Sequence, residues 1–209
     1  MRNRYFETRY TFNSGRKRVW RAITERLQRY IPKESSVLEL GAGYCDFINQ
    51  IIANKKTALD FDESSEQYKG ANVRFVKGSV LNFVPTEKYD VVFASNFLEH
   101  FTVTENEFIM KTVYQALAEN GKLILIQPNY YYCYRNYFDD YTHKMVFSHN
   151  NIIDFQRANK FRVCFVKRRF LPFSFKSHLP ASYVLTKLYL MSPIKPFAKQ
   201  MLIVAEKDV

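Results

Sequence analysis

Short apolar runs alternate with segments of helical periodicity along most of the chain. The apolar runs predict buried strands at 37–40, 57–61, 73–77, 89–95 and 122–127. The periodic segments predict intervening helices at 44–54, 64–69 and 104–118. Strands that alternate with helices predict a doubly wound α/β fold, in which helices cover both faces of a mostly parallel sheet.

Further elements are expected on either side of this alternation. A helix capped by Ser14 is expected to run to about Tyr30, with Pro32 ending it. After the central segment we expect a helix at 149–158 and strands at 161–167 and 200–207. The two late strands suit an antiparallel closing hairpin, so the predicted sheet has seven strands.

The 209 residues are enough for one such domain and short for two. We therefore predict a single domain over 1–209. Its expected parts are a basic helical cap, a cofactor-binding core, a tyrosine-rich lid without clear periodicity, and a C-terminal part with a helix, strands and a basic, Pro-containing insertion; they span 1–34, 35–128, 129–148 and 149–209.

The formal net charge of +11 is concentrated toward both ends of the chain. Such a surface attracts nucleic acid, anionic lipid or phosphorylated substrates, although a generically basic surface explains the charge equally well. The three cysteines form neither a metal-binding nor a disulfide pattern. With no secretory signal and no long apolar run recognisable in the sequence, we expect a cytoplasmic protein.

The segment "ELGAGYCDF", from Glu39 to Phe47, follows the first strand as a glycine loop would. A dinucleotide fingerprint requires a glycine where Asp46 stands, and this carboxylate would repel a pyrophosphate. Glycines stand at alternate positions, Gly41 and Gly43, and Cys45 occupies the place where a third glycine of this spacing would come. The loop therefore does not indicate a dinucleotide.

Glu39, Gly41 and Gly43 resemble motif I of the class I S-adenosylmethionine-dependent methyltransferases, whose usual form is E/D-x-G-x-G-x-G. Later segments, "ALDFDES", "YDVVFASNFLEHF" and "NGKLILIQPN", resemble the family's segments in the same order. The resemblance covers about 37–168 and implies a Rossmann-like fold. It also implies S-adenosylmethionine as cofactor and S-adenosylhomocysteine as product. Because the cofactor has no phosphate and carries a cationic sulfur, a nearby carboxylate favours it.

The resemblance assigns cofactor contacts to the ends of four strands. The loop residues would meet the methionine end, Asp60 the ribose hydroxyls and Phe61 the adenine; Asp60 could instead cap a helix, a role open also to Asp62. Ser79 stands where the family commonly has an aspartate, which weakens that adenine contact. After the fourth strand, Asn96 would meet the methionine end, through its carbonyl more than its side chain. The full predicted set is Glu39, Gly41, Ala42, Gly43, Asp60, Phe61, Gly78, Ser79, Val80 and Asn96.

The sequence lacks the motifs of several methyltransferase classes that act on particular acceptors. Asn96 is not followed by the D/N-P-P-Y-type segment of amino methyltransferases that act on bases. Carbon-5 cytosine methylation requires a cysteine near the fourth strand, whereas the nearest one, Cys133, comes after the fifth. The chain shows no metal-ligand set of the catechol type, so we predict no metal. Nucleic acid as a partner rests on net charge alone.

The lid segment "DYTHKMVF" looks like a D-x-T-H-x-x-x-F segment of bacterial small-molecule and glycan-directed methyltransferases. His143 is therefore the leading candidate for the base in O-methylation, with Asp139, Asp140 and Tyr141 as orienting groups, and His100 is second. Each histidine could instead be structural, His143 pinning the lid and His100 lying packed beneath it. Positioning alone could also suffice for methyl transfer.

Two further segments allow two interpretations each. The lid tyrosines could bind an acceptor or form the core of the lid; they are Tyr130, Tyr131, Tyr132, Tyr134, Tyr137 and Tyr141. The basic and apolar segment 168–200 could lie on the inner face of an anionic membrane or wrap the sheet as a loop.

Together these patterns predict an S-adenosylmethionine-dependent methyltransferase acting on a hydroxyl of a glycan, a lipid-linked precursor or another small molecule. One alternative is an RNA or protein methyltransferase that uses the basic surface. Another is a non-catalytic binding protein with the same fold. The sequence leaves the oligomeric state open.

Overall fold

A computed structural model describes residues 15–172 and 181–208 of the chain. In this part of the molecule, seven strands form one sheet in the order β3-β2-β1-β4-β5-β7-β6. The strands are β1 (Ser36–Leu40), β2 (Lys55–Asp60), β3 (Arg74–Lys77), β4 (Tyr89–Ser95), β5 (Leu117–Pro128), β6 (Phe161–Pro172) and β7 (Ala198–Lys207).

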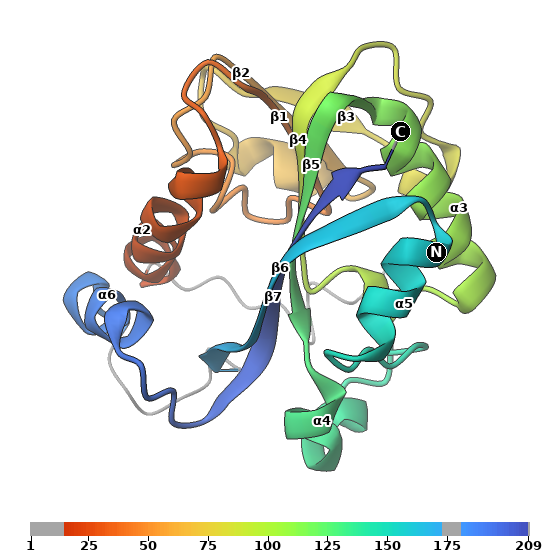
Figure 1. Cartoon of the computed structure of the whole chain (residues 1–209). Helices are drawn as coiled ribbons and strands as arrows, with labels where there is room; N and C mark the ends of the chain where they lie inside the picture. Colours follow the sequence, from red (N-terminus) through yellow and green to blue (C-terminus); the bar gives the residue numbers. More distant parts are fainter. Residues whose placement is uncertain (1–14, 173–180, 209) are drawn as a thin grey trace.

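Helices cover both faces of this sheet, as Figure 1 shows: α2 and α6 lie on one side, and α3 and α5 on the other. The α-helices are α2 (Arg16–Leu27), α3 (Val103–Ala116), α4 (Tyr130–Cys133), α5 (Asn151–Ala158) and α6 (Tyr183–Met191). Short 3-10 helices are η1 (Gln28–Tyr30), η2 (Glu63–Tyr68), η3 (Val80–Asn82), η4 (Leu98–His100) and η5 (Tyr134–Asp139). Across the described residues, no helix combines the length and apolar character that crossing a membrane requires.

The strand directions confirm the predicted fold class. The pairs β1–β2, β1–β4, β2–β3 and β4–β5 are parallel, whereas β7 is antiparallel to both β5 and β6. Strand order reverses between β1 and β4, which lie side by side although β2 and β3 come between them in sequence. In doubly wound sheets this switch point opens the crevice in which ligands bind, beyond the carboxyl ends of the strands.

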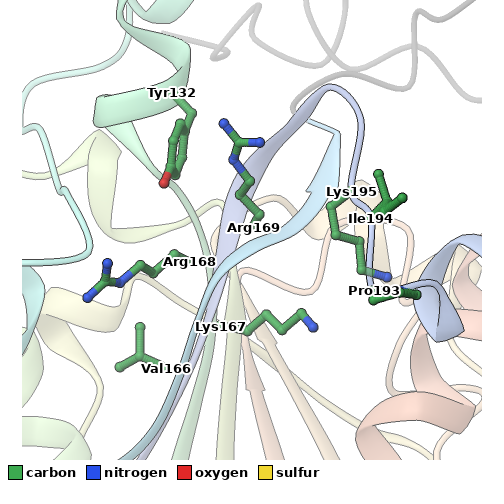
Figure 2. A pocket seen from close by; sticks show the side chains of 8 residues that line it. All are labelled: Tyr132, Val166, Lys167, Arg168, Arg169, Pro193, Ile194 and Lys195. Atoms are coloured by element: carbon green, nitrogen blue, oxygen red, sulfur yellow. The ribbon is translucent and has the colours of Figure 1, made fainter.

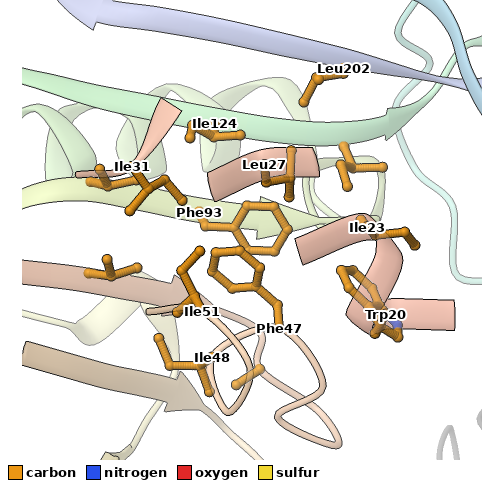
Figure 3. Close-up of a cluster of buried hydrophobic side chains, with 14 of the residues drawn as sticks. Trp20, Ile23, Leu27, Ile31, Phe47, Ile48, Ile51, Phe93, Ile124 and Leu202 are labelled. Atoms are coloured by element: carbon orange, nitrogen blue, oxygen red, sulfur yellow. The ribbon is translucent and has the colours of Figure 1, made fainter. Parts of the chain in front are cut away.

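An apolar layer fills the space on each face of the sheet. On the α2 side, Phe47 stacks on Phe93 with ring centroids 3.8 Å apart, and Trp20 meets Phe93 edge-on (Figure 3). On the opposite side, Ile109 and Ile152 from α3 and α5 are fully buried against the sheet. Full burial on both faces explains why the central strands are nearly continuous apolar runs in the sequence.

The predicted helix at 44–54 is wrong: this segment is a series of turns. Some helical bonds form, such as Asn49 N–H to the Cys45 carbonyl at 3.1 Å and Ile51 N–H to Phe47 at 3.0 Å. Cys45, however, has a φ of 53° and Gly43 a φ of 52°, which a right-handed helix does not accommodate. Side-chain periodicity carries no information about this reversal of the backbone.

The segment before β7 also differs from expectation, because α6 forms where the sequence indicated only a mixed basic and apolar stretch. The helix is capped by Ser182 and lies on α2, where the Tyr183 hydroxyl donates to Glu25 at 2.6 Å. The expected cap of the first helix, Ser14, lies outside the described residues, and Gly15 precedes α2 without a side-chain cap.

Candidate active site

The glycine loop after β1 is tied to the end of the neighbouring strand β2. The N–H groups of Gly41 and Ala42 both donate to the Leu59 carbonyl, at 2.9 and 3.2 Å, and Gly43 N–H donates to Asp60 at 2.7 Å. Gly41 and Gly43 have positive φ values of 64° and 52°, a region that glycine enters without steric cost. The predicted loop is therefore present, but these three N–H groups bond to the protein itself.

Asp60 is the group that joins the two strand ends. One carboxylate oxygen accepts from Gly43 N–H and the other from Asp62 N–H at 2.9 Å, in a side chain only 4% exposed. Burial raises the pKa of this carboxyl, and the two backbone donors partly offset that. Asp62 caps η2 by accepting from Ser64 N–H, so Asp60 is not needed as a helix cap.

Glu39 also lies beneath the loop. Its carboxylate accepts from Ile48 N–H at 3.1 Å and is almost fully buried. Burial raises the pKa of this carboxyl well above its ordinary value, and the neighbouring carboxylates of Asp46 and Asp60 add to the effect. Asp46 in turn is paired with Arg16 of α2 at 2.9 Å. Glu39 thus shapes the turn that follows the loop.

The loop after β4 lies over the glycine loop. A Cβ atom added to Gly41 would lie 2.5 Å from Cδ2 of Phe97, so the aromatic ring rests directly on this glycine. Asn96, which precedes Phe97, has a φ of 48°, and its side-chain oxygen accepts from Gln200 of β7 at 2.7 Å. The side chain of Asn96 is thereby engaged by the protein, and the cofactor contact through its carbonyl stays a prediction.

The adenine side of the predicted site has an exposed aromatic ring. Phe61, directly after Asp60, is 51% exposed, whereas Val80 is buried. Gly78 N–H donates to the Asp60 carbonyl at 2.8 Å, and the Ser79 hydroxyl caps η3 by accepting from Leu81 N–H. A carboxylate beside a flat exposed ring and a glycine loop suits an adenosine, so the residues present fit the predicted cofactor.

The positive φ of Cys45 can be tested through its effect on stability. The side chain is fully buried, and φ is 53°. Left-handed backbone costs a residue with a Cβ about 1–2 kcal/mol. Cys45→Gly should therefore stay within about 1 kcal/mol of the wild-type unfolding free energy, because relief of strain offsets the lost burial. Cys45→Val should cost about 2–4 kcal/mol, since a β-branched residue fits this φ poorly. Urea denaturation measures both.

Cys133 provides the matched control for this prediction. It is also buried, at a φ of −120°, so glycine there loses burial without relieving strain. We expect Cys133→Gly to be less stable than Cys133→Val, the reverse of the order at Cys45. The same order at both positions would contradict the strain argument.

The lid joins the loop after β4 at two histidines. The rings of His100 and His143 have centroids 5.1 Å apart. Nδ1 of His100 lies 2.9 Å from the Thr142 hydroxyl, which donates to Asp140 at 2.6 Å. Nδ1 of His143 lies 2.6 Å from the Tyr137 carbonyl. The two histidines predicted separately from the sequence therefore share one site.

This site contains a buried acid that sequence analysis missed. Glu99 is 1% exposed, and one of its carboxylate oxygens accepts from Gln127 of β5 at 2.6 Å. Burial raises the pKa of Glu99 to about 8. Burial, with the neighbouring His143, lowers the pKa of His100 to about 4, so this imidazole is neutral at physiological pH.

The other predicted lid residues divide into two groups. Asp140 orients the site through Thr142, but Asp139 is exposed and accepts from Asn136 instead. Tyr137 is fully buried and belongs to the lid core. In contrast, Tyr131, Tyr134 and Tyr141 are more than half exposed.

This glycine loop, the acid that ends β2 and the strand order are those expected of a class I S-adenosylmethionine-dependent methyltransferase. A family model described as a methyltransferase domain matches residues 12–170. The chain belongs to this methyltransferase family, and it is a transferase enzyme with S-adenosylmethionine as cofactor. The predicted class is thus confirmed.

Solved structures share this fold at low sequence identity. An S-adenosylmethionine-dependent methyltransferase from Archaeoglobus fulgidus is 19% identical, with 97% of each chain covered and a TM-score of 0.64. One from Mesorhizobium loti is 14% identical, covering 89% of this chain and 98% of that chain, at a TM-score of 0.65. DhpI, solved as a complex with SAH, is 18% identical over 98% of this chain and 91% of its own, also at 0.65. No curated protein matches the chain.

Proposed function

We propose that this enzyme methylates a hydroxyl group of a glycan, a lipid-linked precursor or another small molecule. The observation that carries the proposal is the meeting of His143 from the lid with His100 after β4, at a centroid distance of 5.1 Å. A hydroxyl must lose its proton as it accepts a methyl group, and imidazole takes up protons near neutral pH. His100 comes four residues after the predicted methionine contact, Asn96.

The cofactor, when bound, supplies an electrophilic methyl group on a sulfonium sulfur. In this proposal the glycine loop and Asn96 position its methionine end, and Asp60 accepts from the ribose hydroxyls. Phe61 packs against the adenine through its exposed ring. Phe97, resting on Gly41, helps to exclude water from the reacting end.

The hydrogen bonds around His143 set which nitrogen accepts the proton. The Tyr137 carbonyl can only accept, so Nδ1 of His143 carries the hydrogen of their 2.6 Å bond. The lone pair then lies on Nε2. Asp140 and Thr142 similarly orient His100, because the hydroxyl that donates to the carboxylate accepts from Nδ1. We assign proton uptake to His143 and positioning to His100.

A basic pocket near the lid supports an anionic acceptor. The pocket, of roughly 500 Å³, is lined by Tyr132, Val166, Lys167, Arg168, Arg169, Pro193, Ile194 and Lys195 (Figure 2). The Arg169 guanidinium lies 4.4 Å from the centre of the Tyr132 ring, so the pocket contacts the lid directly. Four cationic side chains with an aromatic ring suit the phosphates and sugar of a lipid-linked precursor.

An apolar row beside this pocket supports contact with an anionic membrane surface. Val184, Leu185, Leu188 and Met191 follow one face of α6 at helical spacing, and each is about half exposed or more. Ile194 and Phe197 extend the row at 76% and 84% exposed. Apolar side chains next to basic ones are the composition of helices that lie in a membrane interface.

Transfer of labelled methyl groups tests the acceptor. Purified enzyme and radiolabelled S-adenosylmethionine are incubated with an extract of the source cells, which is then separated into lipid, polysaccharide, RNA and protein. We expect label in the lipid or polysaccharide fraction, released by conditions that cleave methyl ethers. We also expect Leu188→Glu to reduce labelling of membrane lipid with unchanged affinity for S-adenosylhomocysteine.

Three outcomes would contradict the proposal. Label confined to RNA or protein would support the alternative based on the basic surface. Binding of S-adenosylhomocysteine without label in any fraction would support a non-catalytic binding protein. Equal labelling of membrane lipid by wild type and Leu188→Glu would remove the membrane contact while leaving the acceptor chemistry in place.

A further inference from the structure

Three metal-binding side chains meet where the lid joins the loop after β4. One carboxylate oxygen of Glu99 and one ring nitrogen each of His100 and His143 all lie within 4.8 Å of one another. Atoms bound to one cation at about 2.0–2.2 Å lie about 3–3.5 Å apart. Small side-chain rotations would therefore bring the three groups to ligand distance.

Glu99 is buried in a way that its own contacts do not explain. One oxygen accepts from Gln127 at 2.6 Å, but the other oxygen, Oε1, is buried with no hydrogen-bond partner among the described residues. An unpaired buried carboxylate oxygen costs several kcal/mol unless a proton or a cation satisfies it. A carboxylate oxygen of this same side chain belongs to the cluster formed with the two histidines.

Both histidines have the outer hydrogen bonds that metal-binding imidazoles usually make. Nδ1 of His143 donates to a backbone carbonyl, that of Tyr137, and Nδ1 of His100 bonds to the Thr142 hydroxyl. The hydroxyl is backed by the Asp140 carboxylate at 2.6 Å. Such partners fix the orientation of the rings, as hydrogen bonds around metal-binding imidazoles do.

The backbone holds these groups together across a long separation in the chain. The Glu99 carbonyl accepts from Lys144 N–H at 2.8 Å and from Met145 N–H at 3.2 Å. The residues beside His143 are thereby fastened to the residue that carries the carboxylate. The site is built on backbone hydrogen bonds and does not depend on flexible surface side chains.

We propose that Glu99, His100 and His143 together bind one divalent first-row transition-metal cation. Two imidazoles and one carboxylate suit Zn²⁺, Mn²⁺, Fe²⁺ or Co²⁺ better than Mg²⁺ or Ca²⁺, which favour oxygen ligands. Three protein ligands leave coordination positions open, the pattern of catalytic sites. A hydroxyl of the acceptor bound at an open position becomes more acidic.

The cation changes the role of the two histidines. With the cation bound, the two histidines would be ligands, the cation would stabilise the deprotonated hydroxyl, and the proton would pass to solvent; without the cation, His143 takes up the proton. This role in methyl transfer rests on the proposed function, whereas binding of the cation does not. The sequence prediction of no metal overlooked the set because His143 lies far from Glu99 and His100 in the chain.

Binding of Zn²⁺ and Co²⁺ alone tests the site. The full chain, freed of any affinity tag and stripped with a chelator, is titrated with Zn²⁺ by calorimetry and with Co²⁺ by visible absorption. We expect one equivalent of Zn²⁺ and cobalt bands typical of mixed nitrogen and oxygen ligands. Glu99→Gln and His143→Ala should each weaken Zn²⁺ binding at least about tenfold and remove the cobalt bands.

Asp139→Asn is the matched control, because it converts an exposed carboxylate of the same lid to an amide. It should bind Zn²⁺ as the wild type does. Wild-type affinity in Glu99→Gln and His143→Ala, or no Zn²⁺ binding by a folded wild type, would overturn the proposal. S-adenosylhomocysteine is titrated into the same stripped protein. Binding of this product without binding of Zn²⁺ would overturn the cation site alone and leave the proposed function standing.

Discussion

Alanine in place of His143 is expected to lower the rate of methyl transfer about 10²- to 10⁴-fold, the usual contribution of a positioned acid or base. The imidazole is held by the Tyr137 carbonyl at 2.6 Å and faces His100 across 5.1 Å, so its loss removes a preorganised group. Affinity for S-adenosylhomocysteine should stay within about twofold, because the predicted cofactor contacts lie on other loops. Labelled methyl incorporation and calorimetry measure the two quantities.

Asp139→Ala is the control for this variant, since it alters an exposed lid residue that bonds to Asn136. It should retain nearly full activity. Equal activity of His143→Ala and the wild type would show that positioning alone drives the reaction. A chelator separates the two roles of the imidazole: activity insensitive to the chelator supports direct proton uptake, and activity restored by added Zn²⁺ supports a ligand.

Alanine in place of Asp60 is expected to reduce affinity for S-adenosylhomocysteine at least about 100-fold. Two hydrogen bonds from ribose hydroxyls to a carboxylate are each worth about 1.5–3 kcal/mol, and about 1.4 kcal/mol corresponds to a factor of ten. The variant should also lose about 1–3 kcal/mol of stability, because the carboxylate anchors Gly43 N–H at 2.7 Å. Calorimetry and urea denaturation measure the two effects.

Asp62→Ala is the control that separates cofactor binding by Asp60 from a general loss of stability in this segment. This neighbouring acid caps η2 by accepting from Ser64 N–H, so its loss should cost about 0.5–2 kcal/mol of stability. The affinity of this variant for S-adenosylhomocysteine should change little. A similar loss of affinity in both variants would mean that Asp60 acts only by holding the glycine loop.

The sheet was predictable because its central strands are buried on both faces. The apolar run at 89–95 coincides with β4, whose residues are mostly buried. The helix prediction for 44–54 was wrong because the fold of this segment depends on the positive φ at Cys45. The spacing of apolar side chains gives no information about the sign of φ. The helix α6 was missed because its apolar residues face outward, so the segment has no buried stripe to signal a helix.

The sequence indicated which residues belong to the candidate site, but it gave little information about which of them contact one another. Histidine chemistry and the lid segment indicated His143 and His100, but their meeting depends on a lid that folds back through Thr142 and Asp140. Glu99 was missed because a glutamate beside a short helix usually faces solvent. Its position next to His100, directly after an apolar strand, is the signal that could have indicated it.

The place of β7 in the sheet has a consequence for the order of folding. β7 follows β6 in the chain but lies between β5 and β6, and its Gln200 holds Asn96 at 2.7 Å. During synthesis, β5 therefore presents an open apolar edge until β6 and β7 have both emerged and dock as a hairpin. The loop after β4 takes its final shape only at that step, so a nascent chain can complete its glycine loop long before the proposed site around His100 is formed.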